Sequence, residues 1–142
     1  MKITIPLLAI LFAGTLMAKQ AELFYDSVET NPEEGKPLKM ELRETKREDK
    51  FSIVEVKFSS GASVPSIMFV VKGMYEIAKM RRASHFINLK EWEDENGNWM
   101  YKVGFTNTDA VEPAEYFGDD IDREKEPTFL SVKDYDILWG KK

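Results

Sequence analysis

The chain has 142 residues, of which 25 are acidic, 20 are basic and none is cysteine. Because acidic residues outnumber basic ones, the chain is not attracted to nucleic acid or to an anionic lipid surface, and we expect neither as a partner. A chain without cysteine forms no disulfide, carries no lipidated cysteine and has no thiolate for catalysis or metal binding. With 43% apolar residues, the sequence predicts one domain held together by a single hydrophobic core.

Residues 1–18 have the composition of an export signal. Lys2 gives a positive start, an apolar run extends to Met17, and Ala18 is a small residue at the expected cleavage position. The apolar run is shorter than the ~20 residues needed to cross a bilayer. We therefore predict a signal peptide, no membrane anchor, and a mature protein that is periplasmic or secreted. The alternative is a buried N-terminal strand or helix.

Residues 19–37 are predicted to be a lead-in, rich in proline and glycine towards its end, to a single domain over 38–142. The run 44–50 is almost wholly charged and predicts a solvated hairpin loop. On either side of it, apolar and polar residues alternate as in half-buried strands. The predicted strands of the first half cover 23–28, 38–43 and 51–58.

The region 65–82 predicts the main helix, with Ser63 as its cap. Its apolar stripe has helical spacing and is expected to pack on a sheet: Val64, Ile67, Met68, Val71, Met74, Tyr75 and Ala78. Gly73 lies among further apolar flank residues, where its cost of about 1 kcal/mol in a helix is offset only by a close neighbour. The helix is therefore expected to need cover on nearly two faces.

The second half predicts strands over 85–92 and 99–106, joined by a hairpin at Asn96-Gly97. An acidic loop over 107–128 and an aromatic tail follow, in which Ser131 has the spacing of a capping box. The predicted fold class is α+β: an antiparallel β-β-α-β-β sheet, one main helix on one face and an aromatic C-terminal tail.

No catalytic, cofactor or metal site is predicted. His85 is the only histidine, and catalysis would require Ser84 or a remote carboxylate to act with it. The acidic runs 94–98 and 119–124 are interpreted as a hairpin turn and a solvated loop, with weak calcium binding as the alternative. The chain also lacks a glycine-rich phosphate loop and a Gly-x-Ser-x-Gly motif.

The excess of apolar side chains is the one feature that points to a role. The aromatic tail, together with Tyr116 and Phe117 of the acidic loop, either wraps back over the helix or leaves a surface for a protein partner or a second copy. We therefore expect an exported, non-enzymatic domain that binds a protein or itself. A small periplasmic hydrolase and a calcium- or small-ligand-binding module are the alternatives. The candidate interaction surface comprises Phe69, Val70, Ile77, Met80 and Trp139.

The stretch 51–89 resembles a group of small Gram-negative envelope proteins of unknown function. The resemblance rests on a strand at 51–58, one helix, an Arg82-Ala83-Ser84 ending and an aromatic strand that begins at His85. Many of that group are lipoproteins, but this chain lacks the required cysteine. The resemblance implies an envelope location and the strand-helix-strand core, and it carries no functional residues.

Overall fold

The computed structural model describes residues 22–30, 38–59 and 64–140. The predicted signal peptide over 1–18, the loop over 31–37 and the Ser63 cap lie outside these ranges. The strands are β1 (Tyr25–Thr30), β2 (Leu38–Arg47), β3 (Phe51–Phe58), β4 (His85–Glu93), β5 (Trp99–Thr106) and β6 (Leu130–Ser131). The helices are α2 (Val64–Met80), α3 (Pro113–Phe117) and α4 (Val132–Trp139), with a 3-10 turn η1 (Gly118–Asp120).

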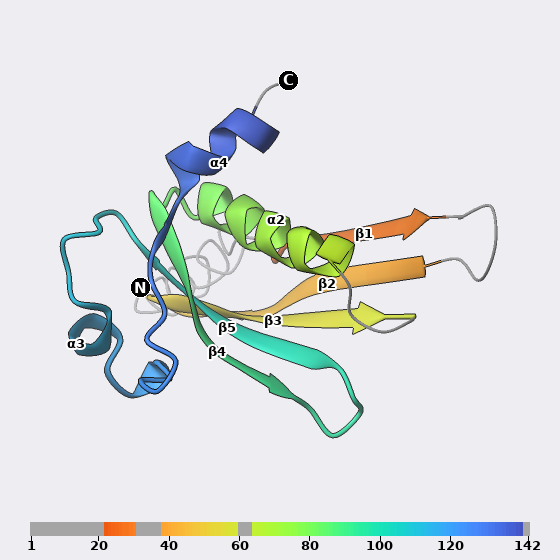
Figure 1. Ribbon diagram of the computed structural model, residues 1–142, viewed down its shortest axis with the longest axis horizontal. Coiled ribbons are helices and arrows are strands. Elements are labelled where there is room, and N and C mark those ends of the chain that lie inside the picture. The colour runs from red at the N-terminus through yellow and green to blue at the C-terminus, as the bar shows by residue number, and fades with distance from the viewer. Residues whose placement is uncertain (1–21, 31–37, 60–63, 141–142) are drawn as a thin grey trace, which may run out of the picture.

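One curled, six-stranded antiparallel sheet organises the fold, in the order β1-β2-β3-β5-β4-β6. Because β5 lies between β3 and β4, these two strands run parallel and α2 crosses between them, as in a split β-α-β unit. Figure 1 shows α2 lying across one face of the sheet and α4 beside it. The predicted α+β class, with one main helix on an antiparallel sheet and an aromatic C-terminal tail, is confirmed.

The β4–β5 hairpin forms where the sequence places it. Gly97 adopts a φ of 83°, which glycine tolerates without strain. The Asp94 carboxylate accepts hydrogen bonds from the backbone N–H groups of Asn96 and Asn98, both at 2.9 Å. These bonds stabilise the turn and lower the pKa of Asp94, with the bond from Asn98 as the main cause.

The predicted hairpin loop over 44–50 is largely wrong. Strand β2 continues to Arg47, with a bulge between Glu44 and Lys46, so that only 48–50 form the turn. Glu44 is buried, because it occupies the same alternating position as Leu42 and faces α2. The run 44–50 was predicted to be solvated because it is almost wholly charged, but it contains the buried Glu44.

The face of α2 that packs on the sheet differs from the prediction. Val70, Met74, Ile77 and Ala78 are buried in the core that also contains the sheet residues Leu42, Val54, Val56 and Val103. Within the predicted stripe, Met74, Tyr75 and Ala78 are buried. Val71 is only half-buried, whereas Ile67 is 60% exposed and Met68 is exposed. The helix is rotated so that part of the predicted flank faces the sheet.

Gly73 fixes this rotation. A Cβ atom at this position would collide with the Leu42 side chain of β2, which is itself fully buried. The missing side chain lets the helix backbone approach the sheet on the side of Val70 and Ile77. This contact is the close neighbour that a glycine in mid-helix requires.

The tail packs on α2 at Tyr75, on the side opposite to the predicted flank of Phe69, Val70, Ile77 and Met80. Tyr75 is buried beneath α4, where its hydroxyl lies 2.6 Å from Asp136 Oδ1 and its ring lies 5.4 Å from that of Trp139. Tyr135 stacks on Trp139 and contacts Phe86 of β4. The Ser131 side chain makes no capping bond, so the predicted capping box does not form.

Residues 107–129 cover the part of the opposite face of the sheet that β4 and β5 form, a face that the prediction left open. Phe117 and Ile121 pack there with Ile87 and Leu89 of β4 in a second hydrophobic cluster. Gly104 of β5 makes room, because a Cβ atom there would lie 2.6 Å from the Phe117 ring. The chain then passes the β4 edge through β6 and returns to the helix side (Figure 1). Within the described residues, no helix is long and apolar enough to span a membrane.

Candidate functional site

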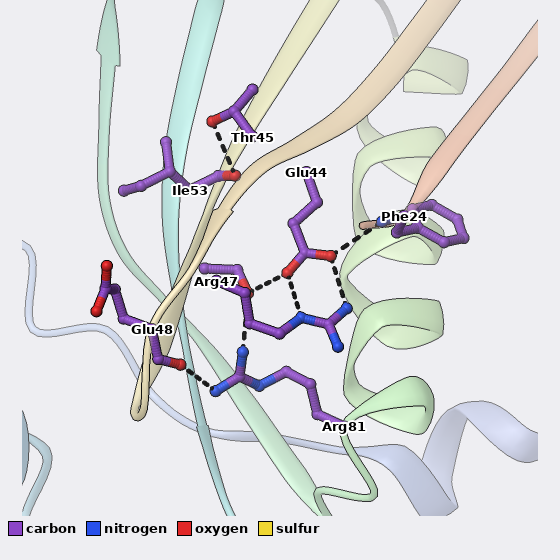
Figure 2. Close-up of polar contacts among 8 residues, drawn as sticks. Phe24, Glu44, Thr45, Arg47, Glu48, Ile53 and Arg81 are labelled. Atoms are coloured by element: carbon purple, nitrogen blue, oxygen red, sulfur yellow. Dashed lines mark hydrogen bonds and ion pairs between the residues drawn. The ribbon is translucent and has the colours of Figure 1, made fainter. Parts of the chain in front are cut away.

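A buried polar cluster lies between β2, β3 and the end of α2, and Figure 2 shows its contacts. The Glu44 carboxylate accepts two hydrogen bonds from Arg47, from Nε at 2.8 Å and from Nη2 at 2.7 Å. It also accepts bonds from Ser52 Oγ at 2.6 Å and from the Phe24 N–H at 3.0 Å. Arg81 joins the cluster by donating to Ser52 Oγ at 3.1 Å.

This cluster is fitted for structure rather than for catalysis. Burial alone would raise the pKa of Glu44, but the bonds from Arg47, Ser52 and Phe24 outweigh it and lower the pKa. The carboxylate is therefore ionised and engaged by four donors. Arg81 also donates to the carbonyl oxygens of Glu48 and Asp49 at 2.8 and 2.9 Å, which fixes the β2–β3 turn against the helix end.

His85 lies beside both a hydroxyl and a carboxylate. Its Nδ1 is 2.7 Å from Ser84 Oγ, and its Nε2 is 3.7 Å from Asp109 Oδ2, beyond hydrogen-bond distance. An acyl transfer would require substrate space beside the hydroxyl. The adjoining cavity, described below, is lined by Asp109 and Phe129, but neither Ser84 nor His85 lines it.

Ser84 has a structural role at the junction of three elements. Its N–H donates to the Thr106 carbonyl at 3.0 Å and to Asn107 Oδ1 at 3.1 Å. Its carbonyl accepts the N–H of Val132, the first residue of α4, at 2.9 Å. The ring of His85 meets Phe129 edge-on at 6.1 Å. The pair thus connects β4, β5 and the tail.

The five residues of the candidate interaction surface do not form one surface. Val70 and Ile77 are buried in the core, and this part of the prediction is wrong because α2 is rotated. Phe69 is half-buried against the same core, and Trp139 is half-buried against Tyr75 and Tyr135. Of the five residues only Met80 is exposed, with 44% of its surface accessible.

The acidic run 119–124 is distributed over separate contacts. Asp120 pairs with Lys102 of β5 at 2.9 Å, and Asp122 Oδ1 accepts the Glu124 N–H at 3.1 Å. Within residues 22–30, 38–59 and 64–140, no three histidine or carboxylate side chains are grouped so that they could hold a metal ion.

The covering segment 107–129 contains a cavity of about 470 Å³. One side is formed by residues 109–114 and the other by 121–129. Apolar side chains line it together with polar ones: Val111, Pro113, Ala114, Ile121, Pro127 and Phe129, with Asp109, Glu112, Arg123, Glu126 and Thr128. The volume lies within the ~300–1,000 Å³ typical of ligand sites.

The same segment carries the negative charge of the molecule. Residues 107–128 contain eight acidic and two basic residues, a net charge of −6. The remainder of 19–142 is balanced, with 17 residues of each sign. Counting charge by segment would have found this asymmetry in the sequence, whereas the cavity depends on how the segment folds back on itself.

No family model, curated protein or solved structure matches this chain. The geometry and charge of the chain itself therefore carry the functional argument.

Proposed function

We propose that the protein is an exported, non-enzymatic domain that binds a protein partner through the surface that residues 107–128 themselves form. The single observation that carries the proposal is the net charge of −6 on this segment beside a balanced remainder. A surface of one sign attracts a partner of the opposite sign and speeds its association. The expected partner therefore presents a basic segment.

The charge also argues against a second copy as the occupant of this face. In a two-fold dimer the same patch meets itself, and two segments of charge −6 would be brought together. Like charges in contact are unfavourable. The partner is a different polypeptide.

Binding of a defined basic peptide tests the proposal. We expect an acetylated tetralysine amide to bind the purified protein in a fluorescence anisotropy assay and a tetraglutamate of the same length to show no binding. Binding should weaken several-fold between about 0.05 and 0.5 M NaCl, because salt screens exposed charges. Equal binding of both peptides, or of neither, would refute it.

Export is tested separately. We expect the protein recovered from the cell envelope or the medium to have the intact mass of residues 19–142. A recovered protein that retains residues 1–18 would refute cleavage of a signal peptide.

A hydrolase is the second candidate, favoured by the 2.7 Å contact between Ser84 Oγ and His85 Nδ1. If the protein is a hydrolase, it should hydrolyse an activated ester with a burst phase. The Ser84→Ala variant should remain folded and lose this activity. The binding proposal predicts that any ester hydrolysis is the same in Ser84→Ala and in the wild type.

A further inference from the structure

The cavity within residues 107–129 combines an apolar interior with acidic side chains at one site. Ile121 is buried and Phe129 is half-buried, and both belong to the second hydrophobic cluster. Asp109, Glu112 and Glu126 line the same cavity and are exposed, Asp109 with 72% of its side chain accessible. The lining therefore offers both an apolar surface and negative charge.

The charges that line the cavity are mostly uncompensated. Against the three carboxylates there is one cation, Arg123, which leaves a net charge of −2. Asp109 faces His85 Nε2 at 3.7 Å. Among the described residues, Glu112 and Glu126 form no side-chain ion pair, in contrast to Asp120, which is paired with Lys102.

We infer that this cavity receives a lysine side chain of the basic partner, an inference that rests on the proposed function. A lysine brings an apolar four-carbon stem and a compact ammonium group. The stem removes apolar surface from water against Ile121 and Phe129, while the ammonium remains near the carboxylates.

A neighbouring carboxylate outside the cavity provides the matched control. Glu115 lies on α3 in the same acidic segment and is exposed, but it does not line the cavity. Exchanging Glu115 for glutamine thus removes the same charge from the same face without changing the cavity. Arg123 provides a control of opposite sign, because its removal makes the lining more negative.

The experiment measures the affinity of acetylated tetralysine amide for five forms of the protein by isothermal titration. We expect Glu112→Gln and Glu126→Gln each to weaken binding about three- to fivefold, in keeping with exposed ion pairs. Glu115→Gln should change it less than about twofold, and Arg123→Gln should strengthen it. Thermal melting of each variant confirms that it is folded.

A second measurement tests entry of the stem into the cavity. Butylammonium should bind more tightly than methylammonium, by up to about fourfold for each methylene buried, and butanol should not compete. The amide signals of Ile121 and Phe129 should shift in the NMR spectrum as butylammonium is added.

The outcomes separate the inference from the proposed function. If tetralysine binds but Glu115→Gln weakens it as much as Glu126→Gln, the acidic face binds the partner and the cavity inference fails. If butylammonium binds more tightly than the peptide, the ligand is a free amine and the polypeptide source is wrong. If neither binds, both proposals fail.

Discussion

Replacing Glu44 with alanine should destabilise the fold far more than replacing any exposed glutamate. The carboxylate is fully buried and accepts four hydrogen bonds, two of them from Arg47. Removing one partner of a buried pair typically costs about 3–5 kcal/mol, because the other charge is left unpaired. The Arg47 side chain retains 19% exposure and can reach water. We therefore expect a cost near the lower limit, about 3 kcal/mol.

Glu48 is the matched control for this substitution. It pairs with Lys46 at 3.4 Å, and the two side chains are 44% and 61% exposed. Such a pair contributes about 0–1 kcal/mol, so Glu48→Ala should have little effect. Only the Glu48 carbonyl contacts Arg81, and alanine retains that carbonyl. Urea unfolding followed by tryptophan fluorescence gives both free energies.

The pH dependence of stability provides an independent check. The pKa of Glu44 is lowered in the folded protein, whereas the unfolded chain has the ordinary value of about 4.3. Its ionised form therefore stabilises the fold above that pH, and this contribution is lost as the pH falls through the folded-state pKa. Glu44→Gln should be less stable than the wild type at pH 7, and the difference should shrink on acidification. Equal costs for Glu44→Ala and Glu48→Ala, or a difference independent of pH, would refute the reasoning.

Three further predictions concern the packing of α2. Ile77→Asp should unfold the protein, because it buries an unpaired charge, while Ile67→Asp should change stability by less than about 0.5 kcal/mol in the same urea assay. Gly73→Ala should destabilise by about 1–3 kcal/mol through overpacking against Leu42. Helix propensity alone predicts the opposite sign, and in a Leu42→Ala background the substitution should become neutral or stabilising. Deleting residues 129–142 should uncover Tyr75 and cause association by light scattering or lose several kcal/mol, at ~25 cal/mol per Å².

Local signals predicted the second hairpin and most of strands β1 to β5, but neither the extension of β2 to Arg47 nor β6. Strand β5 has the bounds expected from alternation over 99–106, and Asn96-Gly97 occupies the turn. Both features depend on side chains within a few residues of each other, because a strand alternates with period two and a tight turn requires positive φ. Features that depend only on residues close together in the sequence are therefore the ones that the sequence predicts best.

The rotation of α2 could not be predicted from its apolar residues, because they surround most of the helix. The deciding contact joins Gly73 to Leu42, and these residues lie on different elements. The glycine was a usable signal, since an uncompensated glycine in a helix implies a close neighbour. If the side of α2 that carries Gly73 is assigned to the sheet, Val70 and Ile77 lie in the core.

Glu44 shows the limit of interpreting a charged run as solvated. It continues the inward alternation of Met40 and Leu42, and that register was visible in the sequence. The partners that make its burial tolerable come from β2 itself, from β3 and from Phe24. The sequence therefore revealed the direction of the side chain, while the compensation for its charge required the assembled sheet.

The segment 107–128 separates the side chains that hold it from those that carry its charge. Phe117 and Ile121 fasten it to the sheet, and the Asp122 N–H adds a hydrogen bond to the Leu89 carbonyl at 2.8 Å. Most of its carboxylates, including Glu112 and Glu126, are exposed. Because different side chains perform the two tasks, Glu112→Gln and Glu126→Gln should weaken partner binding without changing stability. Truncating Phe117 should impair both, since the charged surface keeps its shape only while the segment remains attached to the sheet.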